Sequence, residues 1–296
     1  MLSVNTNYGA YVALQNLNST NKALNETQNR INTGLKISGP KDNGAIFAIA
    51  EGLRADIQSL NAVTNSLDRT TSIVDTAVAA GQAVSDLLKE MKEKALAAKD
   101  ASIDANTRAA YNADFVALRD QITKVLDNAI FDGTNLVDGS TSSIAALANA
   151  AGDSFVTASA QDLSLSGSIV SLTSTASIST STKASSAIST IESSLDALGL
   201  ALANLGTDSK KLGVHKNFMS KLADELKNGL GNLVDADLAT ESAKLQALQT
   251  KQQLGIQALS IANQAPSTLL AHFRESPGVS NSGAGRNSGS APVHDD

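Results

Sequence analysis

Residues of the kinds that do chemistry in proteins are sparse in this chain and do not gather in its sequence. The three histidines, His215, His272 and His294, lie far apart, and there is no cysteine to act as nucleophile, metal ligand or disulfide partner. The sequence holds no His-Glu-x-x-His zinc motif, Gly-x-x-x-x-Gly-Lys phosphate loop or Gly-x-Ser-x-Gly elbow. We interpret the histidines as solvated residues and expect a protein that is not an enzyme and uses no metal or cofactor.

Two aspartates, Asp235 and Asp237, come nearest to a paired-carboxylate site. Residues two apart on a helix point in different directions, so a role in starting or capping a helix is favoured over acid–base catalysis. The sequences Asn18-Ser-Thr and Asn25-Glu-Thr match the N-glycosylation pattern. Both lie on an expected helical contact face, which makes chance the better interpretation.

Charge and composition exclude several further classes of protein. The net charge of −6 argues against nucleic acid as a partner, because phosphate binding needs a basic surface. No stretch reaches the ~18 apolar residues of a membrane-spanning helix, so membrane insertion is not expected. The first residues lack the basic start and apolar centre of a secretion signal, so any export is expected to use another route. Aromatic residues make up only 3% of the chain, which favours long packed helices over an enzyme core.

The N-terminal half predicts three long helices. Gly34 and the Gly39-Pro40 pair are expected to end the first helix, and the second is expected to start near Asn43. Gly81 is predicted to end the register of the second helix, with a change of phase after it. The expected contact faces of the three helices are Leu14, Leu17, Asn21, Leu24, Gln28, Ile31 and Leu35; then Ile46, Ala50, Leu53, Ile57, Leu60, Thr64, Leu67, Thr71, Val74 and Val78; then Tyr111, Phe115, Leu118, Ile122, Val125 and Ala129.

The C-terminal half predicts two more helical segments. A four-three series runs from residue 184 to residue 233 and includes Ile188, Leu195 and Leu202. The pattern slips at Gly229 and Gly231, which we predict to be a hinge, as we do for Gly39 and Pro40. The next register consists of Val234, Leu238, Glu241, Leu245, Leu248, Gln252, Gly255, Leu259 and Ala262.

Residues 140–183 have a different composition, dominated by serine and threonine. The stretch 163–173 alternates between apolar and polar residues around Gly167-Ser168, which is typical either of a β-hairpin or of irregular surface. Residues 275–296 have no aromatic side chain and are expected to be a disordered tail. The fold class predicted is therefore mainly α: a long antiparallel helical coiled-coil bundle with a small Ser/Thr-rich outer segment.

Long heptad patterns leave two interpretations open, an ordinary helical bundle or a subunit that shares its contact faces with other copies. Motifs at both ends favour the second, because they closely resemble those of bacterial flagellins, in particular the short alphaproteobacterial, Caulobacter-type form. The resemblance covers about residues 1–139 and 184–274. Its motifs include Leu-Ser-Val-Asn-Thr-Asn at 2–7, Asn-Arg-Ile-Asn-Thr-Gly-Leu-Lys-Ile-Ser at 29–38, Phe-Asp-Gly-Thr-Asn-Leu at 131–136 and Val-Asp-Ala-Asp-Leu-Ala-Thr-Glu-Ser-Ala at 234–243.

The resemblance implies a division of labour along the chain. Residues 1–33 and 240–274 would pair antiparallel as a terminal coiled coil that lines the inner tube of a filament. Residues 34–139 and 184–239 would form a rod-like helical bundle around it, and residues 140–183 would lie outermost, where the family often carries O-linked sugars. The 22 residues of the tail are unlike the family.

The resemblance also implies a location and a set of partners. The chain would be secreted through the flagellar type III export apparatus and would polymerise with itself into the extracellular filament used for swimming. A chaperone would hold the C-terminal segment before export, and the filament cap and hook-junction proteins would contact the assembled subunits.

These functions assign roles to residues on the terminal faces. The assembly seam is expected to use Leu14, Leu17, Leu24, Ile31, Leu35, Val234, Leu238, Leu245, Leu248 and Leu259. Polar members of the same series, Asn21, Gln28, Glu241 and Gln252, are expected to select its register at a cost in stability. Short coiled-coil helices are marginal alone, so we expect the two ends to be disordered in the free subunit and to fold on addition to the filament.

Three rival functions stay open from the sequence. A hook–filament junction protein would share the terminal regions and form a short ring. An enzyme-bearing flagellin would need a catalytic insertion, and residues 140–186 contain no histidine, cysteine or glutamate. A non-polymerising adhesin would bind a surface through the same segment or the tail.

Overall fold

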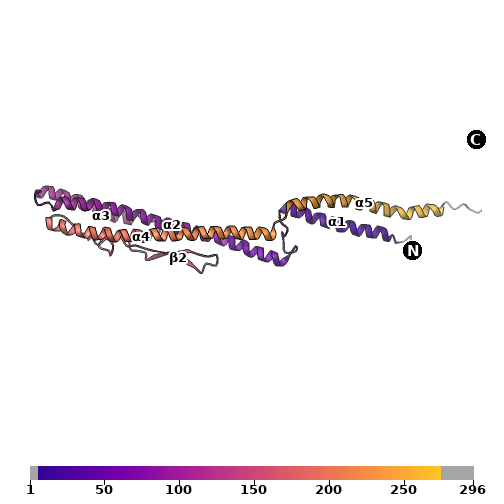
Figure 1. Cartoon of the computed structure of the whole chain (residues 1–296), viewed down its shortest axis with the longest axis horizontal. Helices are drawn as coiled ribbons and strands as arrows, with labels where there is room; N and C mark the ends of the chain where they lie inside the picture. Colours follow the sequence, from indigo (N-terminus) through magenta and orange to yellow (C-terminus); the bar gives the residue numbers. More distant parts are fainter. Residues whose placement is uncertain (1–5, 275–296) are drawn as a thin grey trace, which may run out of the picture. The chain divides into compact units, whose positions relative to one another are not determined.

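The chain is mainly helical, as the sequence predicts. Its structure is a computed structural model that describes residues 6–274, with side chains described as far as residue 264. Over these residues there are five helices and one antiparallel two-stranded sheet (Figure 1). The elements are α1 (Tyr8–Thr33), α2 (Gly44–Lys99), α3 (Ala105–Asp127), β1 (Ser143–Leu147), β2 (Phe155–Ser159), α4 (Ser181–Val234) and α5 (Leu238–Arg274). The expected tail, residues 275–296, lies outside the described residues.

The helices divide between two compact units. Within the described residues, a terminal unit comprises residues 6–38 and 235–274 and contains α1 and α5, and a central unit comprises residues 39–234 and contains the other elements. The first boundary coincides with the expected Gly39-Pro40 turn, where the Asp42 amide donates to the carbonyl of Gly39 at 3.1 Å.

The hinge predicted at Gly229 and Gly231 is wrong. Both glycines lie inside α4, which continues without a break to Val234. An interior glycine costs a helix about 1 kcal/mol relative to alanine, which is too little to end a well-packed helix of 54 residues. The second unit boundary instead follows Val234.

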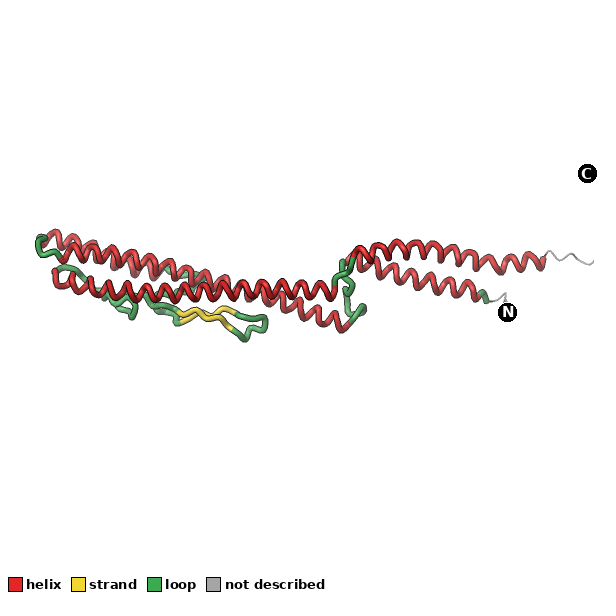
Figure 2. The backbone as a smooth tube through the Cα atoms, viewed as in Figure 1, coloured by secondary structure: helices red, strands yellow, loops and turns green. Residues whose placement is uncertain are grey.

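The core of the central unit is an antiparallel contact between α2 and α4, which Figure 2 shows side by side. From Leu60 to its end, the residues that α2 buries there step three and four apart: Leu60, Val63, Leu67, Thr70, Val74, Ala77, Gly81, Val84, Leu88, Met91, Ala95 and Ala98. The predicted change of phase at Gly81 is therefore wrong. Gly81 is a buried member of one continuous register.

Small residues occupy many positions of this contact, and this explains a repeated error of one residue in the predicted faces. In α4 the structure buries Ala187, Ser194 and Ala201. The predicted members, Ile188, Leu195 and Leu202, each lie one residue later and are half-buried at the flank. The pattern in the sequence favoured the larger side chains, whereas two long helices approach closely where small side chains face each other. The face predicted for α3 joins the same core.

The small sheet is a β-hairpin of residues 143–159, drawn in yellow in Figure 2. Its register pairs Ser143 with Ser159 and Leu147 with Phe155. The turn is held by Asn149, whose side-chain oxygen accepts from the Gly152 amide at 3.0 Å and from the Ser154 amide at 3.3 Å.

The alternating stretch 163–173 is not the hairpin that the sequence left open, because no strand forms there. Its apolar members Leu163, Val170 and Leu172 are buried against the helices instead. The apolar residues that alternate with polar ones in this stretch belong to a loop, and their side chains pack on the helical core.

Gly81 provides a test of how closely α2 and α4 pack. A Cβ atom at Gly81 would lie 2.7 Å from Cδ2 of Leu202 and 3.4 Å from Cδ1 of Leu163. We predict that Gly81→Val destabilises the central unit by about 1–3 kcal/mol, because the added methyl groups overfill the contact. The same change at Gly206, where a Cβ meets nothing within 4 Å, is expected to be neutral or slightly stabilising.

The measurement is the midpoint of urea unfolding followed by circular dichroism. Equal midpoints for the two glycine variants would contradict the close contact at Gly81.

Candidate functional site

The two terminal helices form an antiparallel pair along one face of each helix. On α5 the face consists of the predicted residues Glu241, Leu245, Leu248, Gln252, Gly255, Leu259 and Ala262, all of them buried or half-buried. On α1 it consists of Ala13, Leu17, Thr20, Leu24, Thr27 and Ile31. Alternate members of the α1 face therefore lie one residue earlier than predicted, as in the central unit.

Threonines take the places that the prediction gave to larger residues on α1. Thr20 can be buried because its hydroxyl donates to the Asn16 carbonyl at 2.9 Å. The structure exposes Leu14 to 45% and places Gln28 on the solvent side. Leu14 is thus an apolar side chain that the single chain leaves without cover.

Polar pairs connect the two helices across this face. Gln252 donates from Nε2 to Oδ1 of Asn21 at 2.8 Å, which joins two of the four polar residues predicted for the seam. Glu241 is 9% exposed and accepts from Arg30 at 3.0 Å. The structure therefore finds cross-helix partners for Asn21, Glu241 and Gln252 but not for Gln28.

The half of the pair near the start of α1 has further specific contacts. Asn7 caps α1 by accepting from the Ala10 amide at 3.1 Å, and its Nδ2 donates to the Ala262 carbonyl at 2.6 Å. At Gly255 the helices approach closely, because a Cβ there would lie 3.3 Å from Cδ1 of Leu17. These contacts hold one antiparallel register along the pair.

Asp237 caps the start of α5, as the sequence predicted. Hydrogen bonds from the Thr240 hydroxyl and from the amides of Thr240 and Ala239 hold the pKa of Asp237 below its ordinary value of 3.8. A lowered folded-state pKa means that the cap contributes fully above pH 3.8 and loses its effect as the pH falls below that value. The nearby Asp235 lies in a β-bridge with Leu35.

The α1–α5 pair buries little apolar surface. Among the buried residues of α1, only Leu24 is large and apolar. In α5, as far as residue 264, only Glu241 is buried. Large side chains face solvent instead: Tyr8 is 80% exposed, Tyr11 70% and Ile261 70%. Leu238, a predicted seam residue, is 49% exposed. A groove of about 440 Å³ between α1 and α5 is lined largely by small and apolar residues around Leu17 and Leu254.

The last predicted seam residue, Val234, is 2% exposed at the end of α4 in the central unit, apart from the α1–α5 face.

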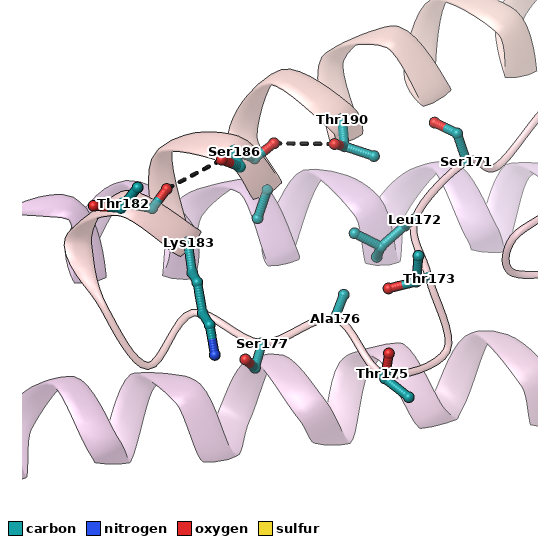
Figure 3. Close-up of a pocket in the computed structure, with 11 residues that line it drawn as sticks. Ser171, Leu172, Thr173, Thr175, Ala176, Ser177, Thr182, Lys183, Ser186 and Thr190 are labelled. Carbon is teal, nitrogen blue, oxygen red and sulfur yellow. Dashed lines mark hydrogen bonds between the residues drawn. The ribbon is translucent and has the colours of Figure 1, made fainter.

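A second candidate site is a hollow of about 340 Å³ in the central unit, lined mainly by hydroxyl groups (Figure 3). Ser171, Thr173 and Thr175 reach it from the loop before α4, and Thr182, Ser186 and Thr190 reach it from the first turns of α4. Lys183 extends across it in Figure 3 toward Ser177. The Ser186 and Thr190 hydroxyls donate to carbonyls four residues earlier, at 3.2 and 3.0 Å.

Side chains that the sequence analysis missed anchor the irregular outer segment. Asp208, Lys211 and His215 lie on one stripe of α4 and bond the backbone of the hairpin region: Ser159 donates to Asp208 at 2.9 Å, Lys211 to Thr157 at 2.5 Å, and His215 Nε2 lies 2.8 Å from the Ala148 carbonyl. The sequence shows that these three residues are three and four apart on a helix, but it does not show which backbone groups they bond. His215 is thus a structural anchor rather than a solvated residue.

Chemical sites of other kinds do not emerge from the part of the chain that the structure describes. Within it, no three His, Asp or Glu side chains gather where they could hold a metal ion. Across the same residues, no helix has the length and apolar character to span a membrane.

Comparisons with known proteins match most of the chain. The family model for the bacterial flagellin N-terminal helical region matches residues 4–142, and the model for the C-terminal helical region matches residues 188–273. Flagellin FljM of Caulobacter vibrioides is 53% identical over 272 residues, covering 92% of this chain and 98% of the relative. A flagellin of Brucella melitensis is 36% identical, covering 93% and 100%.

Among solved structures, a putative flagellar hook-associated protein from Vibrio parahaemolyticus matches 66% of this chain and 100% of its own with a TM-score of 0.52. At 13% identity this likeness concerns the fold alone.

The Asn21–Gln252 pair allows a double-mutant test of register selection. We predict that Asn21→Leu or Gln252→Leu alone lowers the temperature at which filaments dissociate, because losing this half-buried hydrogen bond costs about 0.5–1.5 kcal/mol per subunit. The double variant is expected to recover most of this loss, because two leucines pack together. Additive losses in the double variant would show that the hydrogen bond contributes nothing.

Proposed function

The chain belongs to the bacterial flagellin family and is a structural, non-enzymatic subunit of the extracellular flagellar filament; from this premise we propose that its terminal unit carries the contacts through which copies polymerise. The observation that supports this is the shortage of buried apolar surface in the α1–α5 pair. Two amphipathic helices with one buried leucine between them do not stabilise each other well in water. Neighbouring copies supply the missing cover.

Each helix has apolar residues suited to such contacts on its outer side. Tyr11 and Leu14 of α1, and Leu254, Ile256 and Ile261 of α5, are all at least 45% exposed in the single chain. A fibre of identical subunits repeats one pair of surfaces indefinitely, so modest apolar contacts accumulate along its length. The polar pairs within each subunit would then fix the register in which every copy enters.

We propose the division of labour that the family implies. Residues 1–33 and 240–274 line the inner tube, residues 34–139 and 184–239 form the helical rod around it, and residues 140–183 lie outermost. The two compact units support this division, although their boundaries fall after residues 38 and 234. Gly39 and Pro40 would act as the hinge at the first boundary, and residues 235–237 would take the place of Gly229 and Gly231 at the second.

Partners before and after assembly follow from the same exposed residues. We propose that a chaperone covers α5 before export, because the exposed side chains of Leu254, Ile256 and Ile261 would otherwise cause subunits to associate with one another in the cytoplasm. Export through the flagellar type III apparatus would use the marginal stability of α1 and α5, which keeps the ends easy to unfold. The filament cap and the hook-junction proteins would contact the same terminal helices in the assembled state.

The hydroxyl-lined hollow supports a proposal about modification. We propose that O-linked sugars attach to exposed hydroxyls around it, of which Thr173, Thr175 and Ser186 belong to the outer segment or the first turns of α4. Mass spectrometry of peptides from purified filaments tests this proposal. Sugars confined to other parts of the chain would contradict it.

A pair of matched substitutions tests the role of the terminal unit. We predict that Ile261→Asp abolishes filament growth, because a charge is placed in a contact between copies, while leaving the helix content of the subunit unchanged. Leu200→Asp is the control, because Leu200 is also 70% exposed but lies on α4 in the central unit. Electron microscopy after seeding with filament fragments gives the result.

Long filaments from the Ile261→Asp variant would contradict the proposed role of α5. Loss of filaments from both variants would mean that any added charge blocks assembly, and this outcome would also count against the proposal.

A further inference from the structure

The central unit has an exposed apolar patch that neither its core nor the terminal contacts explain. Phe155 of β2 and Val214 and Phe218 of α4 are 55%, 61% and 55% exposed. They surround a hollow of about 610 Å³ between the hairpin and α4, and the ring of His215, also in its lining, lies 6.2 Å from the Phe218 ring at a tilt of 52°. Two of the six phenylalanines of the chain face solvent here, and exposed aromatic groups of this kind mark interaction surfaces.

The patch has a basic surround in an acidic protein. Residues 210–227 of α4 contain five lysines and two carboxylates, whereas the whole chain has a net charge of −6. Lys210, Val214, Phe218 and Lys221 are spaced four, four and three apart, so they follow one stripe of the helix. Among the described residues, Lys210 and Lys221 have neither an ion pair nor a hydrogen bond from their side chains. We call Lys210, Val214, Phe218, Lys221 and Phe155 the basic patch.

The complementary surface lies on the same chain, after α3. Residues 120–162 contain six aspartates and one lysine. Within them Ile130 and Phe131 are 54% and 40% exposed, and Asp127 and Asp132 flank this apolar pair. Asp132 is paired with Arg69 at 3.3 Å on the surface, and both side chains are more than half exposed. We call residues 127–132 the acidic loop. In it two aspartates flank two apolar residues, just as Lys210 and Lys221 flank Val214 and Phe218 in the basic patch.

We infer that the basic patch of one subunit binds the acidic loop of a second copy in the filament, an inference that rests on the proposed function. Both surfaces face solvent in the single chain, so they are available to another copy. A contact between two different surfaces of identical subunits is heterologous and extends without closing, as a filament requires. Lys210 and Lys221 meet Asp127 and Asp132, and the aromatic residues between them exclude water.

The contact is too small to hold two free subunits together. A handful of side chains buries far less than the roughly 1,200 Å² of a stable interface. It therefore operates only when the terminal helices already hold the copies side by side, where the effective concentration is high. The inference thus predicts a monomer in solution and a specific contact in the filament.

Single-cysteine variants test the contact, because the natural chain has no cysteine. Phe131→Cys and Phe218→Cys subunits are mixed, grown into filaments from wild-type seeds and treated with a short thiol-to-thiol cross-linker. We expect covalent dimers from the mixed filaments, and none from the mixed free subunits or from filaments of Phe218→Cys alone. The control mixture uses Leu96→Cys with Phe218→Cys, because Leu96 is 62% exposed on α2.

The outcomes separate this inference from the proposed function. Filaments that grow normally but give no more dimers than the control mixture overturn the contact and leave polymerisation intact. Failure of wild-type subunits to polymerise from seeds overturns the proposed function itself. Circular dichroism of each variant before assembly shows that its subunit is folded.

A charge reversal gives a second result without cysteines. Lys210→Glu with Lys221→Glu is expected to raise the critical concentration for filament growth about tenfold, because two attractive pairs become repulsive. Adding Asp127→Lys to the same chain is expected to restore part of the growth, because one charge pair is then exchanged rather than lost, while the Asp132–Arg69 ion pair is kept. An unchanged critical concentration in the first variant, or no recovery in the second, overturns the inference.

Discussion

The structure depends on an antiparallel helix contact that is incomplete within one chain. The α1–α5 face has the heptad spacing of a coiled coil, but threonines, an asparagine–glutamine pair and a buried glutamate take many of its places. Burial of apolar surface is the main favourable term in folding, and this pair has little of it. Burial within one chain therefore gives this pair little stability, and in our proposal contacts with other copies supply the rest.

The central unit differs from the terminal pair, because it has a large apolar core within the single chain. Its α2–α4 contact is continuous from Leu60 onward and is closed to solvent at its centre, with Val74, Val84 and Leu88 at 0% exposure. Small residues at alternate positions let the two helices approach, and larger side chains at the flanks cover α3 and the outer segment. Side-chain bonds from Asp208, Lys211 and His215 then hold the hairpin to α4. A rigid centre and marginal ends are properties that suit a subunit which is added one copy at a time.

The sequence predicts the helices well because heptad spacing, caps and turn residues act locally. The second helix starts after Asn43 and Asp237 caps the fifth, as expected. The α5 face agrees from Glu241 to Ala262, whereas the first two members of the predicted series, Val234 and Leu238, lie outside it. The errors have two physical causes. Where a large and a small residue are adjacent, as at Ile188 and Ala187, spacing alone cannot tell which one faces a closely packed neighbour. Alternation at 163–173 cannot distinguish a strand from a loop whose side chains are buried on a helix.

The candidate site was predictable only in part. Asn21, Glu241 and Gln252 were visible as polar interruptions of apolar series, and the structure pairs each of them across the helices. Arg30 was missed because a charged residue beside a seam carries no signal until the antiparallel register is known. The basic patch and the acidic loop were missed because each depends on which side chains the folded chain leaves exposed.

The most direct test of the incomplete contact is amide hydrogen exchange, measured by mass spectrometry on the free subunit and on the filament. Our account predicts rapid exchange of α1 and α5 in the free subunit and strong protection of both in the filament. Peptides from the α2–α4 contact are expected to be protected in both states. Strong protection of residues 14–31 and 245–262 in the free subunit, equal to that in the filament, would contradict the account.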